Sequence, residues 1–91
     1  MPASADPALQ VRVRLFASLR EANGWGERLV TPAPEAPTPL DLWHQLQLGP
    51  AGPPGAAPSG IRVAINQQFA SWDTPLAGGD ELAYLPPISG G

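Results

Sequence analysis

Apolar and polar residues alternate along several short stretches of the chain, with the two-residue period of a half-buried β-strand. In residues 9–15 the apolar members of the alternation are expected to face a core, while Arg12 and Arg14 face outward. Further strands are predicted over residues 27–31, 61–65, 68–72 and 81–85. Asn66 and Gln67 are expected to form a hairpin turn between the third and fourth of these strands.

Two other segments have helical character. Residues 17–23 are helix formers that end at Gly24, a residue suited to a helix stop. A second helix is expected over residues 39–48, because Thr38 suits the N-cap position and Asp41 the acid of a capping box. Its apolar residues form a stripe that predicts packing on a sheet: Leu42, Trp43 and Leu46.

The order of these elements is strand, helix, strand, helix and then two or three strands. One main helix crossing a mixed sheet buries all the apolar faces economically, which predicts an α+β fold of the ubiquitin-like β-grasp type. We expect this domain to span residues 9–87, after a disordered lead-in over residues 1–8. Residues 88–91 are expected to form a flexible C-terminal tail, and the proline-rich and glycine-rich segments 32–39 and 49–60 to form loops.

Composition limits the chemistry that this chain of 91 residues performs on its own. It has no cysteine and one histidine, so disulfides, thiolate metal sites and clustered imidazole sites are not expected. A Ser–His–Asp or Cys–His nucleophile is equally unexpected, which argues against a self-contained hydrolase. The single histidine, His44, is interpreted as structural, and no metal site is predicted.

Charge and hydropathy narrow the choice of partners. The net charge is −3 and all five basic residues are arginines, without a basic tract, so we expect no binding to nucleic acid or to a membrane surface. No apolar run approaches the roughly 20 residues that a membrane span needs. Residues 1–8 also lack the basic and then apolar pattern of a signal peptide, so we expect a cytoplasmic location.

The C-terminal end of the sequence carries the candidate chemistry. The last predicted strand is followed by Pro86-Pro87, and the sequence finishes on Gly90-Gly91. Residues 86–91 reach roughly 20 Å from the domain at about 3.3–3.6 Å per residue. Glycine lacks a Cβ, so this end fits a narrow channel and presents its carboxylate to a nucleotide or substrate. The alternative is a frayed chain end without a function.

Three stretches resemble the small subunit of molybdopterin synthase, a ubiquitin-like sulfur carrier with a C-terminal Gly-Gly. These stretches are residues 11–21, 63–67 and, above all, 76–91, which read LAGGDELAYLPPISGG. The sequence departs from the family in its loops 32–39 and 49–60, both of which lie away from the tail.

The resemblance implies a mechanism centred on the Gly91 carboxylate. An E1-like adenylating enzyme uses ATP to form an acyl-adenylate there, and a sulfurtransferase supplies the sulfur of a thiocarboxylate. Ile88, Ser89 and Gly90 then insert with Gly91 into the large synthase subunit, which transfers the sulfur to a pyranopterin precursor of the molybdenum cofactor. The resemblance also implies a heterotetramer, with no cofactor bound to this chain.

Strand alternation predicts where such a partner docks. If Leu82 and Tyr84 face the core, their neighbours on the last strand face outward and form an apolar patch, which on a small protein indicates a partner. The resemblance matches Phe69 and Leu85 to an interface with the large subunit. The predicted interface comprises Ala64, Phe69, Ala83, Leu85, Pro86 and Pro87. The alternative is that Phe69 covers the core of its own hairpin.

Two other functions remain open because they share the activation step. The chain is alternatively a sulfur carrier for thiazole or cysteine synthesis, or a protein modifier that Gly91 joins to lysines of other proteins. The remaining conspicuous residues are interpreted as structural. Asp80-Glu81 is attributed to turn chemistry, and the three tryptophans, Trp25, Trp43 and Trp72, to packing.

Overall fold

The computed structural model describes residues 10–33, 36–49 and 57–87, so the predicted lead-in and the predicted tail lie outside the described residues. Within these ranges the elements follow one another as β1 (Val11–Leu15), α1 (Ala17–Asn23), β2 (Glu27–Val30), α2 (Pro39–Leu46), β3 (Arg62–Ile65), β4 (Gln68–Ala70) and β5 (Glu81–Leu85). Neither described helix has the length and apolar character needed to cross a membrane.

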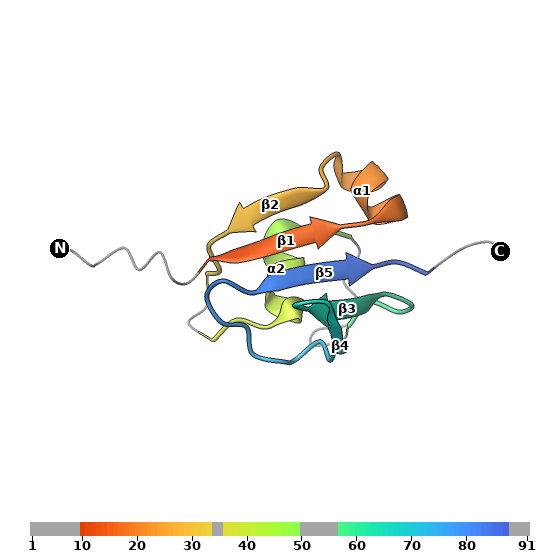
Figure 1. Cartoon of the computed structure of the whole chain (residues 1–91). Coiled ribbons are helices and arrows are strands. Elements are labelled where there is room, and N and C mark those ends of the chain that lie inside the picture. The colour runs from red at the N-terminus through yellow and green to blue at the C-terminus, as the bar shows by residue number, and fades with distance from the viewer. Residues whose placement is uncertain (1–9, 34–35, 50–56, 88–91) are drawn as a thin grey trace.

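The strands form one mixed sheet with the order β2-β1-β5-β3-β4. β5 lies in the middle, parallel to β1 and antiparallel to β3, and β2 and β4 are the antiparallel edges. Figure 1 shows α2 behind this sheet, across one of its faces. The predicted mixed sheet packed on one main helix is therefore confirmed.

The inner face of the sheet, which α2 covers, carries the apolar residues that the alternation placed there. Val11, Val13 and Leu15 are buried, while Arg12 is exposed and Arg14 half-buried. On β5 the side chains of Leu82 and Tyr84 are fully buried in the same core. The predicted inward and outward orientation of the side chains on both strands is confirmed.

An aromatic cluster joins α2 to the sheet. The ring of Trp43 packs edge-on against Trp72 and Tyr84, with centroid distances of 5.6 and 5.4 Å. The hydroxyl of Tyr84 donates a hydrogen bond of 2.6 Å to the backbone carbonyl of Pro39, at the start of the helix. Trp25 is half-buried against the same core, so the interpretation of the tryptophans as packing residues is confirmed.

Local sequence determines the N-terminal end of α2 and the C-terminal end of α1. The predicted capping box of α2 is confirmed, because the Thr38 hydroxyl accepts from the backbone N–H of Asp41 and the Asp41 carboxylate accepts from the backbone N–H of Thr38. The end of α1 is confirmed as well, with Gly24 in the left-handed region at φ 82°.

The predicted C-terminal end of α2 at Leu48 is wrong, because the helix ends at Leu46. Gln47 adopts the left-handed conformation at φ 53° and turns the chain, so that Leu48 folds back and is buried. Gly49 then passes so close to the helix that a Cβ there would lie 2.9 Å from the Trp43 ring. This glycine therefore makes room for Trp43 rather than capping the helix.

Four predicted strands are longer than the observed ones. β1 begins at Val11 and β3 at Arg62, later than the predicted residues 9 and 61. β2 ends at Val30, one residue early. β4 ends at Ala70, because Trp72 leaves the ladder and its indole N–H donates to the backbone carbonyl of Ile61 at 3.1 Å. The hairpin turn at Asn66 and Gln67 is confirmed, with both residues at positive φ as a type I′ turn requires.

We predict that the buried phenol of Tyr84 makes the protein sensitive to alkaline pH. Burial, with a further contribution from the charge of Asp41, raises the pKa of Tyr84 far above its usual range. The stabilisation that the protonated phenol gives to the folded state is therefore fully present below the unfolded-state pKa of about 10. Above that pH, the free energy of unfolding falls by about 1.4 kcal/mol per pH unit. No lysine, cysteine or second tyrosine titrates in this range.

Urea unfolding at several pH values checks this prediction. Tyr84→Phe leaves the Pro39 carbonyl without its donor, so it should lower the free energy of unfolding by about 1–3 kcal/mol at neutral pH. The same variant should be free of the alkaline loss. Parallel stability curves for the two proteins above pH 10 would contradict the prediction.

Candidate functional site

The outer face of the sheet, opposite α2, carries the residues predicted to meet a partner. The register places Ala64 opposite Ala83 on one side and opposite Phe69 on the other. Arg62 lies opposite Leu85 on the same face, at the end of β5 that leads to the C-terminus. Three strands that are separate in the sequence therefore bring most of the predicted interface together.

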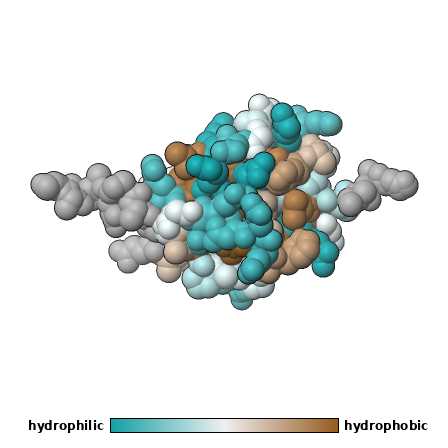
Figure 2. All heavy atoms as spheres, in the orientation of Figure 1, coloured by the Kyte–Doolittle hydropathy of each residue, from teal (hydrophilic) through white to brown (hydrophobic). Residues whose placement is uncertain are grey.

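Beside this end of β5 the surface is hollowed into an apolar groove of about 740 Å³, which we call the tail-side groove. It is lined by Phe16, Ala17, Gly60, Ile61, Arg62, Phe69, Leu85, Pro86 and Pro87. Figure 2 shows hydrophobic side chains gathered toward the end of the face where β5 finishes. A smaller hollow of about 230 Å³, with Ala64 and Ala83 in its lining, adjoins it.

The exposure of the predicted interface residues differs from one to the next. Phe69 is 66% exposed on the outer face, so the alternative that it covers its own hairpin core is wrong. Ala64 and Ala83 face outward as predicted but are only 8% and 7% exposed. Their methyl groups lie below the larger side chains around them and form the floor of the smaller hollow.

Arginine side chains flank the hollows and contact aromatic rings. The guanidinium of Arg62 lies 4.7 Å from the centroid of the Phe69 ring, and that of Arg14 lies 5.1 Å from the Phe16 ring. Arg14 also pairs with Glu81 at 3.4 Å. Each exposed cation–π contact contributes about 0.5–1 kcal/mol, so these arginines order the rim while leaving the ring edges accessible.

The sequence analysis missed four residues of this surface: Phe16, Ala17, Gly60 and Ile61. Phe16 follows β1, where the alternation ends, and nothing in the local pattern distinguishes it from a loop residue. Its position follows from the parallel pairing of β1 with β5, which sets Leu15 opposite Tyr84. That pairing connects segments almost 70 residues apart and has no short-range signal.

The predicted chemical group itself, the Gly91 carboxylate, lies outside the described residues, as do Ile88, Ser89 and Gly90. The structure does describe the start of the segment that leads to them. Pro86 is half-buried and Pro87 exposed, and a Cβ on Gly60 would lie 3.9 Å from the Pro87 ring. The loop before β3 therefore runs beside the chain as far as Pro87.

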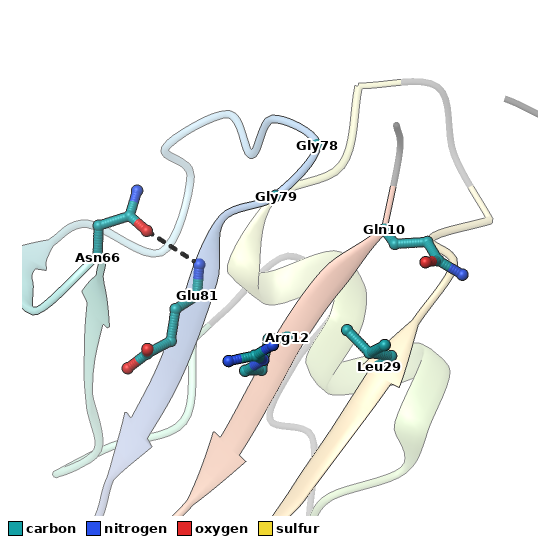
Figure 3. A pocket seen from close by; sticks show the side chains of 7 residues that line it. All are labelled: Gln10, Arg12, Leu29, Asn66, Gly78, Gly79 and Glu81. Carbon is teal, nitrogen blue, oxygen red and sulfur yellow. Dashed lines mark hydrogen bonds between the residues drawn. The ribbon is translucent and has the colours of Figure 1, made fainter. Parts of the chain in front are cut away.

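A third hollow, of about 480 Å³, lies at the opposite end of the outer face and has largely polar walls (Figure 3). The Asn66 side chain in this lining is engaged within the chain. The side-chain oxygen of Asn66 accepts from the backbone N–H of Glu81 at 3.1 Å, and its amide donates to Asp80 at 2.9 Å. Asp80 also accepts from the backbone N–H of Ala77, which confirms the attribution of Asp80 to turn chemistry.

Nothing else in the described part of the chain suggests catalysis. Residues 10–33, 36–49 and 57–87 contain no group of three His, Cys, Asp or Glu side chains that could hold a metal ion. His44 is exposed on α2, away from the hollows. The tail-side groove offers an apolar surface to a partner, and the described residues that line it include no carboxylate, imidazole, hydroxyl or thiol.

A family model and several known proteins match this chain. The model of the ThiS family matches residues 13–91. The molybdopterin synthase sulfur carrier subunit of Homo sapiens is 32% identical over 90 residues, which cover 93% of this chain and 98% of that protein. The subunit of the same name from Escherichia coli (strain K12) is 48% identical over 31 residues, which cover 34% of this chain and 38% of that protein.

Solved structures match over most of the chain. SAMP1, small archaeal modifier protein 1, from Haloferax volcanii has a TM-score of 0.74 at 30% identity, covering 90% of this chain and 99% of that one. A complex of subunits 1 and 2 of molybdopterin-converting factor from Helicobacter pylori contains a chain with a TM-score of 0.56 at 25% identity, covering 90% and 99%. The predicted ubiquitin-like β-grasp fold is thereby confirmed.

We predict that Phe69 contributes little to the stability of the isolated protein. Phe69→Ala should lower the free energy of unfolding by no more than about 1 kcal/mol, since mainly its contact with Arg62 is lost. Leu82→Ala, in the core under the same sheet, should cost about 2–5 kcal/mol. Urea unfolding of both variants checks this, and equal losses would show that Phe69 belongs to the core.

Proposed function

Because the chain belongs to the ThiS family, together with the sulfur carrier subunits of molybdopterin synthase, we propose that it is such a sulfur carrier. The resemblance noted in the sequence is thereby confirmed at the level of the family. One observation on the structure itself supports the proposal in addition to the family membership. The strand that leads to the Gly-Gly end lies in the middle of the sheet, beside an exposed apolar groove.

The proposed chemistry starts at the Gly91 carboxylate, because a free carboxylate is a poor acyl donor. An oxygen of the carboxylate attacks the α-phosphorus of ATP on an adenylating enzyme, and pyrophosphate leaves. Hydrosulfide delivered by a sulfurtransferase then attacks the acyl carbon and forms a C–S bond. The C–O bond to AMP breaks, AMP leaves with the electron pair, a proton goes to solvent, and a thiocarboxylate remains. The chain has no cysteine that could carry sulfur as a persulfide, so it carries sulfur as the thiocarboxylate. The thiocarboxylate then transfers its sulfur to a pyranopterin precursor.

The partner that we propose for the tail-side groove is the large subunit of molybdopterin synthase, in a hetero-oligomer. The likeness to a chain of the Helicobacter pylori complex of subunits 1 and 2 supports this choice. Exposed Phe69 and half-buried Leu85 offer apolar side chains, and large apolar residues in such hollows supply most of the binding energy of an interface. Docking there would place residues 88–91 against the partner.

A second function, protein modification, is favoured by the likeness to SAMP1. In that reading the activated Gly91 forms an isopeptide bond with a lysine of another protein. Isolation of the protein with whatever binds it separates the candidates, because a pterin-synthase large subunit, a thiazole synthase or a ladder of lysine conjugates would each identify one.

We predict that deletion of Gly91, or addition of one residue after it, abolishes sulfur transfer while the fold stays intact. The reacting carboxylate would then be displaced by roughly 3.5 Å from its place in the partner, and misplacements of that size cost orders of magnitude in rate. Sulfur transfer and ATP–pyrophosphate exchange are the measurements, with urea unfolding as the control. A shortened chain that still transfers sulfur would refute the mechanism.

We also predict that Phe69→Arg and Leu85→Arg weaken binding to the large subunit. A buried charge without a partner in the centre of an interface costs 2 kcal/mol or more, which corresponds to roughly 30-fold in Kd. Leu29→Arg is the matched control, because Leu29 is 59% exposed but lies on β2, across the sheet from the tail-side groove. Titration should give an unchanged Kd for that variant, and equal effects of all three would show that the interface is misplaced.

A further inference from the structure

Arg62 is the one charged side chain among the described residues that line the tail-side groove. It faces Leu85 across the β3–β5 ladder and is exposed, and its guanidinium lies 4.7 Å from the centroid of the Phe69 ring. The rest of the lining consists of apolar side chains and a glycine. The groove therefore combines an apolar surface with a single positive charge.

The other arginines of the outer face are compensated within the chain. Arg14 lies 3.4 Å from Glu81 and 3.8 Å from Glu27, and Arg12 lies 3.4 Å from Glu27. Within residues 10–33, 36–49 and 57–87, no carboxylate forms an ion pair with Arg62. The charge that is left over on this face therefore lies at the tail-side groove.

A partner that covers this groove would remove the Arg62 guanidinium from water. Burying a charge without an opposite charge is costly, because the lost hydration is not replaced. The Phe69 ring replaces little of it, since a cation–π contact is weak. A carboxylate, in contrast, accepts two parallel hydrogen bonds from the planar guanidinium and neutralises it. Packing on the ring also reduces the side-chain freedom that forming such a pair would remove.

We propose that the partner surface that covers the tail-side groove carries an Asp or Glu carboxylate, which pairs with Arg62. The proposal rests on the proposed function, which supplies the partner. Phe69 and Leu85 would provide the apolar contact. The ion pair would determine which surface docks and in which orientation, because charge complementarity acts on specificity more than on affinity. A surface with an apolar or basic group at that place would bind more weakly.

Titration of the full chain with the purified large subunit of molybdopterin synthase, at several salt concentrations, tests the proposal. Arg62→Gln should raise Kd about tenfold, because the carboxylate of the partner loses its counter-charge. The variant should also show a flatter dependence of Kd on salt, since the screened interaction is gone. Arg62→Lys keeps a positive charge at this position and should retain the salt dependence.

Arg28→Gln is the matched control. Arg28 is exposed and its guanidinium lies 4.3 Å from the centroid of the Trp25 ring, so this substitution removes the same charge and the same kind of contact. Arg28 pairs with Val13, which faces the core, so it lies on the other face of the sheet. Its strand, β2, is three strand spacings or roughly 14 Å from β3. Urea unfolding should give similar stabilities for the two variants, whereas Kd should change in Arg62→Gln alone.

The ion pair is refuted if Arg62→Gln binds as tightly as the unsubstituted chain or more tightly, because the guanidinium would then only lose hydration on binding. It is equally refuted if Arg28→Gln weakens binding to the same extent, or if Arg62→Gln leaves the salt dependence unchanged. Each of these results leaves the proposed function standing, since the large subunit still binds the unsubstituted chain. If the unsubstituted chain does not bind the large subunit, the proposed partner is refuted and the carboxylate with it.

Discussion

The attachment of β5 to α2 through Tyr84 is the interaction on which the rest of the structure depends. The phenol reaches through the core to the first turn of the helix, and its ring packs against Trp43 and Trp72. β5 is also hydrogen-bonded on both sides, to β1 and to β3. The strand that leads to Pro86 and Pro87 is therefore fixed on both sides and from below.

The inner face of the sheet packs against the core and the outer face is exposed, and β5 contributes residues to both. Its inward residues are large and close the core against the helix. Its outward Ala83 is small and, with Ala64 beside it, leaves a hollow that larger side chains surround. Phe69 stays exposed at the edge of that hollow after folding. Removing its side chain from water against a partner would therefore contribute favourable free energy to binding. The face is therefore shaped for association.

Local sequence signals predicted the parts of the fold that depend on neighbouring residues. The alternation in β1, the capping box at Thr38 and the positive-φ turn at Asn66 need no distant partner, and all three were predicted. The helix end at Leu46 was not, because it depends on Leu48 finding a place in the core. Nor was the position of Phe16, because it depends on the parallel pairing of the first and last strands. Long-range packing accounts for these differences.

The proposed activation leaves selectivity to the surroundings of the terminus, since an acyl-adenylate reacts with any nucleophile that reaches it. A sulfur carrier and a protein modifier differ only in which nucleophile arrives first. In the proposed complex, the partner would control access from outside, through the tail-side groove. Among the residues that line this groove, Arg62 holds its guanidinium over the Phe69 ring. A positive charge is thus available beside the exposed Phe69 ring for the docking of a partner.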